Sequence, residues 1–167
     1  MVVLKNGWVM TSAALVCFFI TESAFAKPVM PVEDRQTNLE QVIIEALQDE
    51  YRSQAGYDSI LEKYDTIPLF REMKESEGNH IVLLRGLVDK YNISYHDDFV
   101  VPAATSPATL QEAYKAAVSG EIDNIVMFEK LAERDGLPPD VKAVLQQLGD
   151  ESRNHLIEFR RMLNSGR

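Results

Sequence analysis

Four long stretches of the chain show the hydrophobic periodicity of amphipathic helices. Apolar side chains recur in them at alternating steps of three and four residues, which places these side chains on one helical face. The four stretches are residues 38–64, 68–91, 107–134 and 140–164. Asn38 is a suitable N-cap with Gln41 three residues later, Pro68 suits a first helical turn, and Gly136 suits a left-handed helix end. The sequence therefore predicts four helices of similar length.

The connections between these helices predict how they are arranged. Short turns join the first two helices and the last two, so each pair should form an antiparallel hairpin. The middle connection, residues 92–106, could extend over roughly 50 Å, more than the ~36 Å of a helix of about 24 residues. It can therefore cross the whole bundle. An all-α four-helix bundle of two antiparallel hairpins joined by one long crossover has the ferritin-like topology.

The core-facing stripe of each predicted helix is apolar at both ends and polar at its centre. The residues at these polar centres are Glu50, Glu77, His80, Glu121, Ser152 and His155. Because helices of similar length that pack side by side have their midpoints at one level, we expect these side chains to converge inside the bundle.

Burying several carboxylates in one place is unfavourable unless something compensates their charge. An ionised carboxylate in an apolar interior needs a partner or a bound cation, and the four stripes offer no Lys or Arg. Protonated carboxyls, trapped water and a divalent metal ion are the remaining solutions. Glutamate together with neutral imidazole suits iron, manganese or zinc. Glu77 and His80 lie one helical turn apart, so both side chains can reach one ion.

Two segments of the chain repeat each other. Residues 75–82 and 150–157 align with Asn79 over Asn154 and His80 over His155, each followed by two apolar residues. This pattern is typical of a duplicated helical hairpin that carries one set of ligands in each half. Two such sets facing each other would form a two-metal centre.

A family resemblance covers residues 38–163 and depends on short motifs in all four helices. These are Glu50 with Tyr57, Phe70 leading to Glu77-Gly78-Asn79-His80, Gly120-Glu121 with Asn124, and Ser152-Arg153-Asn154-His155. The chain resembles the ferritin-like superfamily, most of all a bacterial branch described as a domain of unknown function, and it is also similar to rubrerythrin-type di-iron domains. The resemblance implies a metal site formed by Glu50, Glu77, His80, Glu121 and His155, with iron as the cofactor.

The chain departs from the di-iron pattern of that superfamily at two positions. Ser152 stands where the second Glu-x-x-His motif has its glutamate, and the adjacent Glu151 lies about 100° round the helix. Asn124 stands where rubrerythrin-like proteins carry an extra carboxylate. Two arrangements stay open: a single metal ion held by Glu50, Glu77 and His80 with or without Glu121, and an asymmetric pair of ions.

The first residues of the chain predict secretion. Residues 1–26 combine Lys5, an apolar run over residues 9–20 and the small-x-small cleavage pattern Ala24-Phe25-Ala26. The run is shorter than the roughly 20 residues that span a bilayer, so we expect a cleaved signal peptide. Residues 27–37 are then a linker and residues 38–164 the bundle. The mature protein is expected to be periplasmic, with no membrane association after cleavage.

Charge and composition narrow the partners and the chemistry. The 167 residues carry a formal net charge of −9, which disfavours nucleic acid and anionic membranes and suits cations. The single cysteine, Cys17, lies in the leader, so redox activity would need an external electron donor. A homodimer stays open. Two functions stay open as well: a di-iron oxidoreductase acting as an oxidase or peroxidase, and a non-catalytic bundle that binds metal passively or has a degenerate site and acts through its surface.

Overall fold

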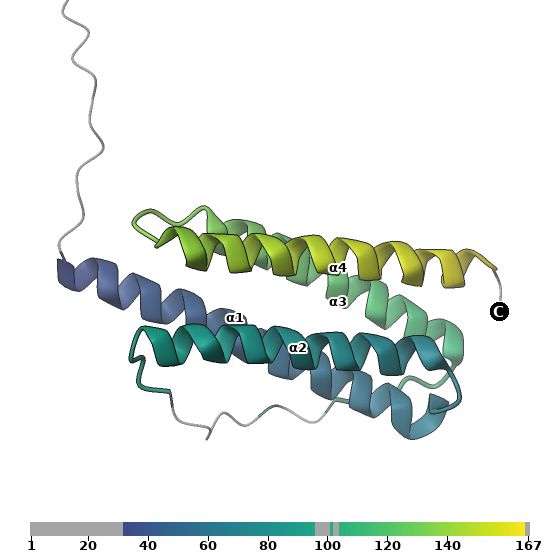
Figure 1. The fold of residues 1–167 in the computed structure, drawn as a ribbon. Coiled ribbons are helices and arrows are strands. Elements are labelled where there is room, and N and C mark those ends of the chain that lie inside the picture. Colours follow the sequence, from purple (N-terminus) through teal and green to yellow (C-terminus); the bar gives the residue numbers. More distant parts are fainter. Residues whose placement is uncertain (1–31, 96–100, 102–103, 166–167) are drawn as a thin grey trace, which may run out of the picture.

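The computed structural model describes residues 32–95, 101 and 104–165, and all regular structure in this part of the chain is α-helical (Figure 1). The four helices are α1 (Val32–Tyr64), α2 (Pro68–Lys90), α3 (Leu110–Ala132) and α4 (Pro139–Ser165). The predicted four-helix bundle is therefore confirmed. The predicted signal peptide and residues 27–31 of the predicted linker lie outside the described residues. No helix in the described ranges has both the length and the hydrophobicity needed to cross a membrane.

The bundle consists of two helical pairs. α1 packs extensively against α2, and α3 against α4, whereas contacts between α1 and α3 and between α2 and α4 are sparser. Figure 1 shows that α1 and α4 run in one direction and that α2 and α3 run in the other. We call the antiparallel pair α1–α2 the first hairpin and the pair α3–α4 the second hairpin. The end of α2 and the start of α3 consequently lie at opposite ends of the bundle.

The start of α1 differs from the sequence prediction. The helix begins at Val32, so residues 32–37 of the predicted linker are helical, although all of them are exposed and none adds to the core. Glu33 and Asp34 in the first turn favour this extension because negative charge stabilises a helix N-terminus. The predicted N-cap at Asn38 is wrong. Its side-chain amide instead donates to the backbone carbonyl of Asp135 at 3.0 Å.

The other helix boundaries follow local capping chemistry. α2 begins at Pro68, as predicted, because proline lacks an N–H that would have no helical partner there. α3 begins three residues later than predicted, where the side chains of Thr109 and Glu112 form a reciprocal capping box. Gly136 has the predicted left-handed φ of 78°, but it lies in the turn beyond α3 and does not cap the helix, which ends at Ala132 with Glu133 as its C-cap.

The apolar core is divided into two clusters. The larger cluster is centred on Ile43, Leu47, Leu84, Phe128, Leu145 and Leu148. The smaller cluster is mainly aromatic, and in it Phe70 stacks on Tyr114 at 5.0 Å and on Phe159 at 5.7 Å between ring centroids. The polar centres of the helices separate the two clusters. Packing on both sides of this polar layer therefore holds the four helices together.

Candidate metal centre

The structure brings the predicted polar residues together in one buried layer. The exposed fractions are 0% for Glu50, Glu77, His80 and Ser152, 1% for Glu121 and 7% for His155. Each of the four helices contributes to this layer, since every helix has its polar residue about midway along its length. The regular spacing of apolar residues on either side fixes each polar side chain toward the bundle axis.

The first group of potential ligands belongs entirely to the first hairpin. His80 Nδ1 lies 2.9 Å from Glu77 Oε2 and 3.3 Å from Glu50 Oε1. Glu77 and His80 share one face of α2 because they are three residues apart, and Glu50 faces them from α1. We call Glu50, Glu77 and His80 the first triad. Its three ligand atoms lie within 4.8 Å of one another, close enough to hold one ion.

The second group links the two hairpins through a shared residue. His155 Nδ1 lies 3.7 Å from Glu77 Oε1 and 3.5 Å from Glu121 Oε1. We call Glu77, Glu121 and His155 the second triad, whose ligand atoms also lie within 4.8 Å of one another. Glu77 thus directs one carboxylate oxygen toward each histidine. The imidazole rings of His80 and His155 stack nearly parallel, with their centroids 5.9 Å apart.

This grouping separates Glu121 from the first triad. A single ion bound by Glu50, Glu77, His80 and Glu121 was one arrangement left open by the sequence. In the structure, Glu121 belongs with His155, and Glu77 alone is common to both triads. The structure therefore offers two ligand groups, each of which could hold an ion, and the single-ion arrangement that includes Glu121 is not formed.

The hydrogen bonding of the layer supports the same conclusion. Buried side-chain atoms without a hydrogen-bond partner among the described residues are both carboxylate oxygens of Glu50 and of Glu77, His80 Nδ1, Glu121 Oε2, Ser152 Oγ and His155 Nδ1. All of them except Ser152 Oγ belong to the two triads. Buried polar atoms normally find partners, so either a shared proton or a bound ion could satisfy this cluster. Carboxylates with imidazole nitrogens form a donor set that fits iron, manganese or zinc.

The charges in the first triad are strongly coupled. Burial raises the pKa of Glu50 well above its usual value, and the neighbouring Glu77 raises it further. Burial would also raise the pKa of Glu77, but His80 and Glu50 outweigh burial and lower it. Burial would lower the pKa of His80, yet the carboxylates of Glu50 and Glu77 raise it to about 11. A positive charge is thus strongly favoured between these two carboxylates, which a metal cation would supply in place of the proton.

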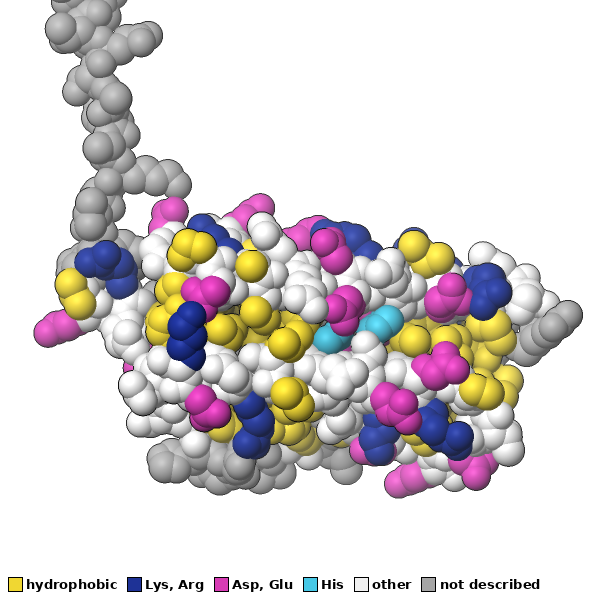
Figure 2. Space-filling model, in the orientation of Figure 1, with side chains coloured by type: hydrophobic (Ala, Val, Ile, Leu, Met, Phe, Trp, Pro, Cys, Tyr) yellow, Lys and Arg dark blue, Asp and Glu magenta, His cyan; other side chains and the backbone are white. Residues whose placement is uncertain are grey.

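A third carboxylate fixes the orientation of His80 from outside the triad. The His80 Nε2 atom and Glu151 Oε2 are hydrogen-bonded at 2.8 Å, and Gln147 donates to the other oxygen of Glu151 at the same distance. When a cation replaces the proton on Nδ1, the proton kept on Nε2 leaves the Nδ1 lone pair facing the triad, which is the tautomer that a metal ligand needs. Histidine side chains lie midway along the seam between α2 and α4, beside an acidic side chain (Figure 2).

Sequence reasoning missed this role of Glu151. It treated Glu151 only as a distorted substitute for the glutamate absent at position 152, whereas the structure directs its carboxylate toward the far side of His80. A general rule of metal sites could have predicted the contact between Glu151 and His80. A metal-binding histidine usually donates its other N–H to a carboxylate, and Glu151 is four residues before His155 on the helix that faces α2.

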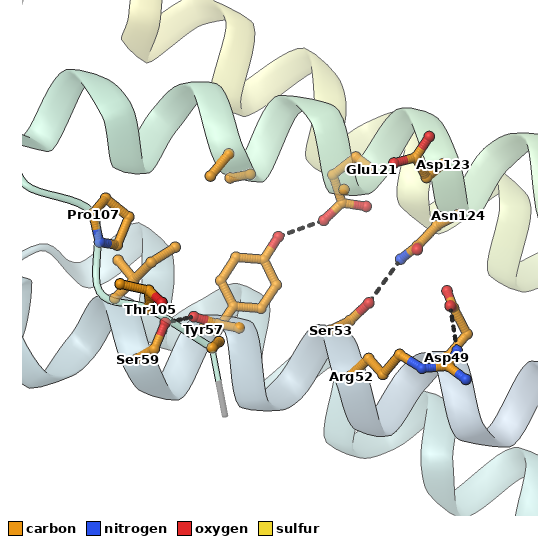
Figure 3. A pocket seen from close by; sticks show the side chains of 16 residues that line it. Asp49, Arg52, Ser53, Tyr57, Ser59, Thr105, Pro107, Glu121, Asp123 and Asn124 are labelled. Carbon is orange, nitrogen blue, oxygen red and sulfur yellow. Dashed lines mark hydrogen bonds and ion pairs between the residues drawn. The ribbon is translucent and has the colours of Figure 1, made fainter. Parts of the chain in front are cut away.

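The second triad has a tyrosine as its outer partner. The Tyr57 hydroxyl donates to Glu121 Oε1 at 2.6 Å (Figure 3). Burial raises the pKa of Tyr57 well above its usual value, and the negative charge of Glu121 raises it further. The hydroxyl therefore stays protonated and holds the carboxylate of Glu121 in place.

The two departures from the di-iron pattern lie at different distances from the triads. Ser152 is fully buried in the polar layer, and its hydroxyl has no hydrogen-bond partner among the described residues. Asn124 belongs to neither triad, and its amide lies 3.2 Å from Ser53 Oγ on α1. Asn124 therefore connects α3 to α1 beside the two triads. Ser152 supplies no carboxylate, so the second triad has one carboxylate fewer than the di-iron pattern.

Comparisons with known proteins bear on the fold alone. No family model matches the chain, and no curated protein matches it. Among solved structures, the chain is similar to the crystal structure of hypothetical protein MJ0754 from Methanococcus jannaschii, with a TM-score of 0.66 and 24% sequence identity. The similarity covers 86% of this chain and 86% of that chain. At this level of identity, the two proteins share a helical fold and no function can be transferred.

Proposed function

We propose that this protein is a secreted, periplasmic ferritin-like protein that binds two transition-metal ions, preferably iron, and uses them in oxidase or peroxidase-type redox chemistry. The proposal rests on the coupling of two buried ligand triads through Glu77. The two antiparallel hairpins and the opposite ends joined by the 91–109 connection are what the ferritin-like topology requires. The acidic net charge of −9 is compatible with attracting cations.

The shared carboxylate is the observation that carries the proposal. Glu77 is fully buried, and its two oxygens face His80 and His155 on opposite sides. Glu77 would hold one cation on each side, so two ions bound at the triads would be close enough to act together. If the glutamates and histidines of the two triads only formed hydrogen bonds with one another, fewer of their buried polar atoms would be without partners.

Different residues of the chain would have different roles in such a metal centre. Glu50 and Glu121 would each complete one triad, and Glu151 keeps the Nδ1 lone pair of His80 available. The two apolar clusters on either side limit the access of bulk water. When bound, a pair of ferrous ions supplies two electrons, which together with two protons reduce one hydrogen peroxide to two waters. An external donor would then return the electrons, since the one cysteine of the chain, Cys17, lies in the predicted leader.

The stoichiometry of bound metal tests the proposal directly. We expect two iron ions per chain in the wild-type protein, measured by elemental mass spectrometry after anaerobic loading and desalting. Glu50→Gln and Glu121→Gln each remove a ligand of one triad and should each lower the content toward one ion. Glu77→Gln removes the shared ligand and should lower the content below either single-triad variant.

A matched control separates the site from general acidity. Glu75 is exposed on α2, two residues before Glu77, so Glu75→Gln should retain two ions. Circular dichroism confirms that each variant is folded. Equal metal content in the wild type and in Glu77→Gln would overturn the proposed site.

Ser152 favours a second candidate function, passive metal binding. The absent carboxylate leaves the second triad with fewer ligands than the symmetric di-iron pattern has, which weakens the case for turnover. Optical spectra of the iron-loaded protein before and after addition of hydrogen peroxide distinguish the two functions. Spectral change with consumption of peroxide supports redox turnover, whereas unchanged spectra at full occupancy support passive binding.

A further inference from the structure

Ser152 has a buried hydroxyl that makes no hydrogen bond to the described residues. Its side chain is 0% exposed, and its Oγ atom lacks a partner even among the backbone carbonyls of its own helix, α4. A serine inside a helix commonly donates to a carbonyl three or four residues before it. Ser59 of α1 does so, since its hydroxyl donates to the carbonyl of Gly56 at 2.8 Å. The hydroxyl of Ser152 is therefore a donor left available within the polar layer.

The position of Ser152 on α4 relates this donor to the second triad. Ser152 lies one helical turn before His155, as Glu77 lies one turn before His80, and residues 75–82 and 150–157 repeat each other. Glu77 and Ser152 thus occupy equivalent positions in the two hairpins. A serine side chain is smaller than a glutamate side chain by the size of a carboxylate group, which is also the size of a small anion such as formate or azide.

The charges of the layer favour an anion at this position. Two divalent ions bring four positive charges, whereas Glu50, Glu77 and Glu121 bring three negative charges. Glu151 supplies a further carboxylate, but its side chain is 35% exposed and contacts His80 of the first triad. The uncompensated positive charge therefore falls at the second triad. A buried charge without a counter-charge is unfavourable, so a bound monoanion would stabilise the loaded centre.

We propose that a small monoanion binds the second ion at the position where the di-iron pattern has its fourth glutamate, and that the hydroxyl of Ser152 donates a hydrogen bond to this anion. Anion binding rests on the proposed metal function, because the anion needs the charge of the ion. The anion supplies the negative charge and the ligand atom that Ser152 does not. A bound anion can exchange, whereas a glutamate of the chain cannot, so the second ion keeps a ligand position for molecules from outside.

Isothermal titration calorimetry with azide on the zinc-loaded protein tests the donor. Zinc suits the same ligands as iron and is redox-inert, so the measurement does not depend on turnover. Ser152→Ala removes the hydroxyl and should weaken azide binding about tenfold, because a hydrogen bond to a charged group contributes about that factor. Ser59→Ala is the matched control, since it replaces another buried helical serine, and it should bind azide as the wild type does. Equal azide affinity in the wild type and in Ser152→Ala would overturn the role of the hydroxyl.

A glutamate at position 152 tests the location of the anion. Ser152→Glu restores the second Glu-x-x-His motif and brings a carboxylate of the chain to the position proposed for the anion. We expect this variant to retain two zinc ions and to bind azide about 100-fold more weakly than the wild type. Circular dichroism confirms that the variants are folded. Azide affinity equal to that of the wild type in folded Ser152→Glu would overturn the location.

Formate tests the same location in the wild-type protein. Because the coupling between two bound ligands is reciprocal, an anion that binds the second ion must strengthen the binding of that ion. We expect formate to strengthen one step of a zinc titration about tenfold and to leave the other step unchanged. The strengthened step should be the one that Glu121→Gln weakens, since Glu121 belongs only to the second triad. Equal effects of formate on both steps would overturn the assignment to the second ion.

The outcomes separate anion binding from the proposed metal function, because zinc content is measured independently by elemental mass spectrometry. A wild-type protein that holds two zinc ions but binds neither azide nor formate would overturn the anion site alone. A protein that holds no zinc would overturn the metal centre, and the anion site with it. Azide binding of equal strength to the metal-free and the zinc-loaded protein would also overturn the anion site, since the anion should then not contact an ion.

Discussion

Replacing Glu151 tests whether the outer partner of His80 tunes a metal site. Glu151→Gln keeps an oxygen that can accept the hydrogen bond from His80 Nε2 but removes the negative charge, and Glu151→Ala removes both. Loss of such an outer carboxylate usually lowers metal affinity about 10- to 100-fold. We therefore expect an affinity loss of about tenfold for the glutamine variant and closer to 100-fold for the alanine variant. These losses correspond to about 1.4 and 2.8 kcal/mol of binding free energy.

The structure also predicts which ion is affected. Glu151 contacts His80, a member of the first triad, and it belongs to neither triad itself. Anaerobic titration with ferrous iron against a competing chelator should therefore show one weakened step and one step close to that of the wild type. The total at saturation should remain two ions per chain.

The control for this experiment is the neighbouring carboxylate. Asp150 precedes Glu151 directly, but its side chain is 74% exposed and pairs with Arg153. Asp150→Asn should therefore bind both ions as the wild type does. Equal losses in Asp150→Asn and Glu151→Gln would refute the reasoning, because the effect would then come from surface charge. So would loss of one whole ion in Glu151→Gln, because Glu151 would then be a direct ligand.

Three further predictions concern the core, Ser152 and the leader. Phe159→Ala removes a fully buried ring and should cost about 3–5 kcal/mol in urea unfolding, whereas Ile157→Ala, at a 61% exposed position, should cost little. Ser152→Ala removes a hydroxyl without a partner, so it should change stability by less than about 1 kcal/mol and retain both ions, and loss of an ion would identify the hydroxyl as a ligand. Mass spectrometry of the exported protein should find Lys27 as the first residue, and an intact leader would contradict the predicted signal peptide.

The helices and the polar layer were predictable because they depend on regular spacing. An apolar residue at every third or fourth position defines the buried face of a helix, so Glu50 and Glu121 stood out as exceptions within that face. The start of α2 was predictable because Pro68 limits the backbone, and Gly136 correctly predicted a left-handed residue in the turn after α3, although the helix ends earlier, at Ala132. The start of α1 was not predictable, because residues 32–37 are exposed and carry no apolar periodicity.

The features that the sequence did not reveal depend on contacts between helices. Glu151 lies off the core-facing stripe of α4, and only the packing of α4 against α2 places it on His80. The pairing of Glu121 with His155 likewise depends on the relative height of helices from the same hairpin.

The distribution of the triads over the hairpins implies an order of assembly. The first triad draws all its ligands from one hairpin, so α1 and α2 alone bring the ligands together, and α4 adds the outer partner Glu151. The second triad joins Glu77 of the first hairpin to Glu121 and His155 of the other. An ion at that position would link the two hairpins across the boundary between them, where helix contacts are sparse. Metal binding would then begin at the first triad, within the first hairpin. Binding at the second triad would follow and would join the two hairpins.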